Sequence, residues 1–158
     1  MTDVSLGWGA FDGLSGDWYV LREIEHHVKL YRRYRHPFSL LVLAFENLEG
    51  IGEASGEGAE ESALEYLMTL IETHVRDVDL VFKWRGEAFV VIMQETEKNA
   101  AQMAGRRLVD SVNRTSLKVG DDFVTLSAGF GAAACPEDGF KAEELLEAAH
   151  LAKQLGSR

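Results

Sequence analysis

Apolar side chains follow helical spacing after residue 18 and then form a continuous run. The helical part carries them at three- and four-residue intervals, namely Leu21, Ile24, Val28 and Tyr31. This spacing predicts an amphipathic helix, and Pro37 marks its expected end. The run at 38–45 (FSLLVLAF) is typical of a strand that is buried on both faces. We therefore expect this strand at the centre of a sheet.

The rest of the chain repeats these two patterns. A Gly- and Glu-rich loop at 49–61 leads into a helix that ends near Arg76. The next elements are two strands, a helix, two strands and a helix, at 80–84, 88–93, 97–112, 116–119, 123–133 and 142–155. Residues 1–17 are Gly-rich and aperiodic, so we assign them to a loosely ordered lead-in. The order predicts one α+β domain over 18–158, with helices packed on a mixed sheet.

Composition narrows the classes of function. The 158 residues carry a net charge of −10, which disfavours nonspecific binding to nucleic acid or to an anionic membrane. No apolar run approaches the length of a membrane span, and the first residues lack the pattern of a signal peptide. We expect a cytoplasmic protein. His26 and His27 have no further His or Cys at ligand spacing, so no metal site is expected.

One basic cluster contrasts with this acidic composition. It lies at the end of the first predicted helix and consists of Lys29, Arg32, Arg33, Arg35 and His36. Cations at a helix C-terminus complement the helix dipole. We favour this explanation of the cluster over binding of a small anionic ligand.

Five stretches of the sequence, in order, resemble the GGDEF family, the diguanylate cyclases that condense two GTP into cyclic di-GMP (c-di-GMP). They are DGLSG at 12–16, PFSLLVL at 37–43, RGEAFVVIMQET at 85–96, VTLSAGFGAA at 124–133 and AKQLG at 152–156. The resemblance covers about 140 residues. It implies the palm-like fold of the nucleotidyl cyclases, an α/β sandwich with a mostly antiparallel five-stranded sheet flanked by helices.

The family holds its divalent cations with an aspartate at the end of the central strand and an acidic residue in the signature hairpin. The resemblance places Ala44 at the first position and Glu87 at the second. A methyl group cannot ligate a metal, and hard cations need oxygen ligands. In the signature itself Arg85 replaces the first glycine, Gly86 keeps the second and Ala88 replaces the last acid. The metal site is therefore expected to be incomplete.

The substrate-binding positions are also changed. Glu49 replaces the lysine that reaches toward the triphosphate, and Gly52 replaces the asparagine that reads guanine. Glu61 keeps a carboxylate where the family has aspartate, and Lys153 matches a lysine that contacts phosphate. Ser157 replaces an arginine. We expect no catalytic residue, no cofactor and no cyclase activity, with residual GTP binding or turnover as the least favoured alternative.

The family's second site, an inhibitory RxxD motif that binds the product, keeps its residues. Arg76 and Asp79 stand at the family's spacing before the signature, and Arg106 matches a further arginine that contacts the same ligand. Arginine forks suit the phosphates and guanine edges of c-di-GMP, and a carboxylate can accept from guanine N–H groups. The resemblance therefore implies a c-di-GMP receptor that signals by contact with a partner protein.

Two alternatives stay open at this point. Arg76 and Asp79, three residues apart at a helix end, can form a surface salt bridge without a ligand. The domain would then be a ligand-independent interaction module derived from a cyclase. The sequence names neither the partner nor the process, and it leaves a homodimer open.

Overall fold

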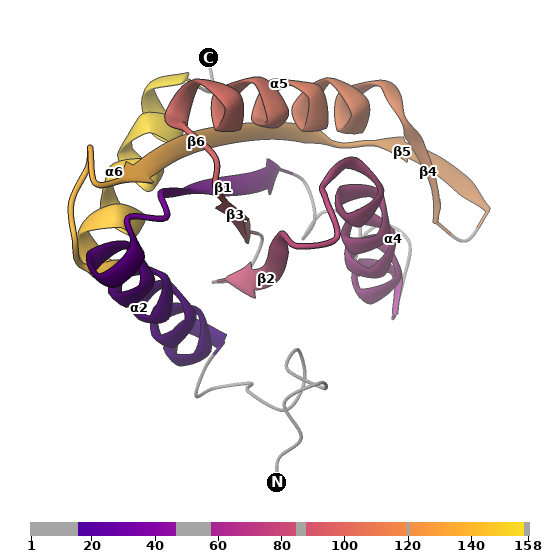
Figure 1. Cartoon of the computed structure of the whole chain (residues 1–158). Helices are drawn as coiled ribbons and strands as arrows, with labels where there is room; N and C mark the ends of the chain where they lie inside the picture. The colour runs from indigo at the N-terminus through magenta and orange to yellow at the C-terminus, as the bar shows by residue number, and fades with distance from the viewer. Residues whose placement is uncertain (1–15, 47–57, 85–87, 120, 157–158) are drawn as a thin grey trace, which may run out of the picture.

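The described residues of the chain form a central antiparallel sheet covered by helices (Figure 1). A computed structural model describes residues 16–46, 58–84, 88–119 and 121–156. The sheet has the strand order β2-β3-β1-β6, with β1 Phe38–Glu46, β2 Leu80–Trp84, β3 Ala88–Gln94 and β6 Ser127–Cys135. The helices are α2 Gly16–Tyr34, α4 Ala59–His74, α5 Lys98–Arg114 and α6 Ala142–Gly156.

Strand β1 lies in the middle of the sheet and is buried on both faces. Successive side chains of a strand point to opposite faces, so its apolar run serves two cores. Leu41, Leu43 and Phe45 pack with α4 and α5 on one face. Phe38, Leu40 and Val42 pack with α2 and α6 on the other. The prediction of a doubly buried central strand is confirmed.

The predicted α+β fold with a mostly antiparallel sheet is confirmed, with one difference in the strands. The expected strand at 123–133 is divided at Leu126 into β5 Asp122–Thr125 and β6. Strand β5 pairs with β4 Ser116–Val119 in a separate two-stranded ribbon, whereas β6 pairs with β1. Within the described ranges the central sheet therefore has four strands rather than five, because the chain changes partner at Leu126.

Helix α5 lies very close to β6. A Cβ atom added at Gly105 would lie 2.4 Å from Cδ2 of Phe130, on β6. Gly105 is buried in the face that α5 turns toward the sheet, together with Ala101, Ala104, Leu108 and Val112. The absence of a side chain at Gly105 is what allows the helix and the Phe130 ring to share this space.

The predicted lead-in falls almost entirely outside the described residues, because α2 begins at Gly16. No helix among those that the structure describes combines the length and the apolar character needed to cross a bilayer.

Candidate functional site

β1 ends at Glu46, but the position at which the resemblance places a metal-binding aspartate, two residues earlier, is Ala44. In the register of the sheet, Ala44 on β1 stands opposite Ala88 on β3 and opposite Gly129 on β6. Ala44 and Ala88 are the positions at which the family resemblance places two acidic residues. Two methyl groups and a hydrogen atom face one another here, and none of them can donate an oxygen to a hard cation.

The other predicted active-site positions are only partly described. Gly52, Arg85, Gly86 and Glu87 lie outside the described residues. Glu61 lies in the first turn of α4, where its side chain is exposed. The backbone of Lys153 belongs to α6, and its side chain is outside the described part. Among the side chains that the structure describes, no three His, Cys, Asp or Glu gather in a group that could hold a metal ion.

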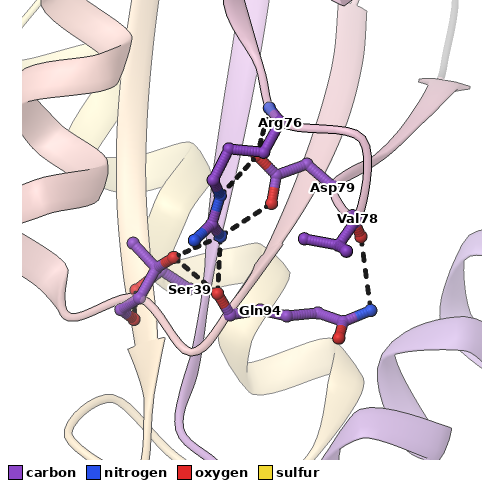
Figure 2. A network of polar contacts seen from close by, with 6 residues as sticks. Ser39, Arg76, Val78, Asp79 and Gln94 are labelled. Carbon is purple, nitrogen blue, oxygen red and sulfur yellow. Dashed lines mark hydrogen bonds and ion pairs between the residues drawn. The ribbon is translucent and has the colours of Figure 1, made fainter.

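Arg76 and Asp79 form a tight pair in the loop between α4 and β2 (Figure 2). The Arg76 guanidinium donates through Nη2 to Oδ1 of Asp79 at 2.8 Å and through Nε to Oδ2 at 3.3 Å. The backbone N–H of Arg76 also donates to Oδ2, at 2.9 Å. Both carboxylate oxygens of Asp79 therefore have donors from the same residue.

Arg76 also reaches the connection between β3 and α5. Its Nη2 lies 2.6 Å from the carbonyl oxygen of Gln94 and 2.8 Å from Oγ1 of Thr96. The side chain of Gln94 returns to this loop and donates to the carbonyl oxygen of Val78 at 3.3 Å. Ser39 on β1 donates to the carbonyl oxygen of Thr96 at 2.8 Å. The network, defined by Ser39, Arg76, Val78, Asp79, Gln94 and Thr96, joins three segments that are distant in sequence.

The two members of the motif differ in burial. The Asp79 side chain is fully buried, whereas the Arg76 side chain is 51% exposed. The hydrogen bonds to Asp79 raise the pKa of Arg76 above its usual value, against the opposite effect of burial. Arg76 thus offers a permanently charged surface to an anion. For a ligand to hydrogen-bond with Asp79, its donors must replace hydrogen bonds that Arg76 now donates to the Asp79 carboxylate.

Arg106 stands apart from this pair. It is exposed on α5, eight residues beyond Lys98, which corresponds to roughly 12 Å along the helix at 1.5 Å per residue. Nothing among the described residues lies within hydrogen-bond or ion-pair distance of its guanidinium. The Arg76–Asp79 pair therefore lies beside the beginning of α5, where Arg76 contacts Thr96. Arg106 lies about two turns further along that helix.

Sequence reasoning missed the partners that hold Arg76. Thr96 and the carbonyl oxygen of Gln94 accept from the guanidinium, and Ser39 fixes the backbone of Thr96. A polar Ser39 in an otherwise apolar strand was the only available signal, since a fully buried hydroxyl requires a partner. Its partner is 57 residues away in the sequence, which local patterns do not reveal.

The fold defines the class: an α+β domain with an antiparallel central sheet flanked by helices. A family model described as "Diguanylate cyclase, GGDEF domain" matches residues 13–155. The chain belongs to the GGDEF family.

The similar proteins include a diguanylate cyclase and a cyclic di-GMP phosphodiesterase. The chain is 28% identical over 114 residues to the diguanylate cyclase DosC of Escherichia coli K12, which covers 71% of this chain and 24% of DosC. It is 25% identical over 126 residues to the cyclic di-GMP phosphodiesterase NbdA of Pseudomonas aeruginosa, covering 80% of this chain and 16% of NbdA. The chain therefore spans a quarter or less of these relatives.

Solved structures confirm the fold. The GGDEF domain of FimX from Pseudomonas aeruginosa superposes with a TM-score of 0.81 at 17% identity, covering 89% of this chain and 86% of that domain. The GGDEF domain of DgcB from Caulobacter crescentus, solved in complex with c-di-GMP, gives a TM-score of 0.76 at 14% identity, covering 85% and 80%. At such identities the likeness carries the fold alone.

Proposed function

We propose that this chain is a catalytically inactive GGDEF domain that binds c-di-GMP and reports it to a partner protein. The observation that carries the loss of catalysis is the juxtaposition of Ala44 and Ala88 at the end of the central strand. A cyclase brings a hydroxyl and an α-phosphate together around divalent cations, which need carboxylate ligands on rigid elements. Here Ala44 and Ala88 supply no carboxylate at this point of the sheet, and of the two metal-binding positions only Glu87 keeps an acid in the sequence.

Binding is supported by the state of Arg76. Its guanidinium is charged and half exposed, and Asp79 and Thr96 hold it in a defined orientation. A pre-oriented guanidinium loses little conformational freedom when it binds a phosphate or a guanine edge. Arg106 supplies a second exposed cation on α5. In the bound state we propose that Arg76 and Arg106 contact the ligand and that Asp79 accepts from guanine N–H groups.

A calorimetric titration with c-di-GMP tests this proposal. We expect the full chain to bind, and Arg106→Ala to weaken binding at least about tenfold, because a charge-assisted hydrogen bond of roughly 1.5–3 kcal/mol is lost. Arg107→Ala is the matched control, since Arg107 is the neighbouring exposed arginine on the same helix. Absence of binding at high ligand concentration, or equal weakening by both substitutions, would refute the receptor.

One observation favours a second candidate, a ligand-independent interaction module. Asp79 is fully buried and both of its oxygens are already satisfied by Arg76, so the motif is complete without a ligand. In this case the pair serves only to hold the loop between α4 and β2 against the β3–α5 connection. The same titration separates the two candidates, because the interaction module predicts no heat of binding for the unmodified chain.

A further inference from the structure

A basic groove with aromatic side chains at its two ends runs along α2. Two hollows of 500 and 280 Å³ adjoin one another here, and Glu25 and Lys29 line both. Trp18 lines the first hollow and Phe140 the second. Arg32 lies 14 positions after Trp18 on the helix, roughly 21 Å at a rise of 1.5 Å per residue. We call this surface the α2 groove.

The aromatic side chains at the two ends of the α2 groove are exposed. Trp18 is 53% exposed and Phe140 is 41% exposed. Each ring lies beside an arginine: Cζ of Arg22 is 5.6 Å from the Trp18 ring centre, and Cζ of Arg32 is 5.5 Å from that of Phe140. Such arginine–aromatic pairs present apolar area and positive charge together, which is the composition of energetically dominant contacts in protein interfaces.

The charge of the α2 groove opposes that of the whole chain. Its lining includes four cations, Arg22, Lys29, Arg32 and Lys141, and two carboxylates, Glu25 and Glu143. No described carboxylate lies within ion-pair distance of any of the four cations. The chain as a whole carries a charge of −10. A local surplus of positive charge on an acidic protein therefore marks this groove for an acidic occupant.

We propose that the α2 groove binds an acidic segment of a partner protein that also carries aromatic or aliphatic side chains. Its carboxylates would face Arg22, Lys29, Arg32 and Lys141, and its apolar side chains would cover Trp18 and Phe140. A short segment experiences mainly the charges within a Debye length of about 10 Å. An extended polyanion such as RNA or a lipid surface also meets the acidic remainder of the protein and is repelled by it.

This inference specifies the partner in the proposed function. It nevertheless depends on none of the residues that are proposed to bind c-di-GMP. The experiment below contains no nucleotide, so its failure and a failure of c-di-GMP binding are separate results.

Two synthetic peptides test the proposal on the full chain. Each has about 14 residues, enough to follow the groove as a helix, with the same Leu and Trp positions. One carries Glu at all other positions and the second carries Lys. We expect calorimetry to show that the acidic peptide binds and that its affinity falls when salt is added. We expect no binding of the basic peptide. Equal binding of both would overturn the proposal.

Charge-reversed variants localise the binding. The double variant Lys29→Glu, Arg32→Glu should lower the affinity for the acidic peptide about tenfold or more. Arg107→Glu combined with Lys118→Glu is the matched control, because both residues are exposed cations outside the groove. A control that weakens binding as much as the groove variant would overturn the proposal.

The other possible occupants give distinct results. If Trp8→Ala with Phe11→Ala strengthens peptide binding, the chain's own first residues compete for the groove, and the partner assignment is wrong. If vesicles containing phosphatidylserine bind in a manner that requires Lys29 and Arg32 while the acidic peptide does not bind, the occupant is a lipid surface, and the proposal is likewise overturned.

Discussion

Replacing Gly105 by valine is expected to lower the free energy of unfolding by about 3 kcal/mol, the upper range for inserting atoms into a packed core. The first added atom would lie 2.4 Å from Cδ2 of Phe130, well inside van der Waals contact. Relief requires either rotation of the ring or movement of α5 away from β6. In Gly105→Ala the added methyl group meets the same ring. Alanine has a higher helix propensity than glycine, which offsets about 1 kcal/mol, so we expect a smaller loss of stability.

Chemical denaturation measures these changes in the free energy of unfolding. Two further variants show whether they arise from the contact with Phe130. Ala100→Val adds similar bulk on the exposed side of the same helix and should change stability by no more than about 0.5 kcal/mol. Phe130→Ala should reduce the cost of Gly105→Val, because it removes the ring that the new side chain meets. A Gly105→Val variant as stable as the original chain would show that α5 does not pack as closely as described.

Arg76→Ala is expected to destabilise the domain by about 2–3 kcal/mol even in the absence of any ligand. The substitution leaves the buried carboxylate of Asp79 without its two guanidinium donors. A buried charge that loses its partner is costly, although the exposure of Arg76 allows water to replace part of what is lost. The acceptors Gln94 and Thr96 lose a donor as well. Thermal and chemical unfolding of the variant measure the effect.

A charge-neutral second substitution identifies the cause. Asp79→Asn in the Arg76→Ala background removes the stranded charge, so the double variant should be more stable than Arg76→Ala alone. Arg33→Ala serves as the control, because Arg33 is an exposed arginine at the end of another helix. If Arg76→Ala unfolds at the same denaturant concentration as Arg33→Ala, the pair does not support the fold. This result also decides how a loss of ligand binding in Arg76→Ala is interpreted.

The elements of the fold were largely predictable because they depend on local patterns. The run at 38–45 predicts β1 and its burial on both faces, and the spacing of Ala101, Ala104, Leu108 and Val112 predicts the buried face of α5. The division at Leu126 was not predictable. No Gly or Pro stands between β5 and β6 in the sequence, and the two strands are separated only by their different pairing partners.

The candidate site was predictable in its residue types but not in its geometry. The spacing of Arg76 and Asp79 places both in one loop, and a salt bridge between them was an expected alternative. The complete burial of Asp79 and the part played by Ser39 and Thr96 depend on contacts between segments that are distant in sequence. The distance of Arg106 from the pair follows from the direction of α5, which sequence spacing does not give.

The central claim is that this GGDEF domain has lost catalysis at the end of β1, where Ala44 stands opposite Ala88. Incubation of the full chain with GTP and either Mg²⁺ or Mn²⁺, followed by chromatographic analysis of the nucleotides, tests this claim most directly. We predict no c-di-GMP above the level of a protein-free sample. Accumulation of c-di-GMP in proportion to time and protein concentration would contradict the account.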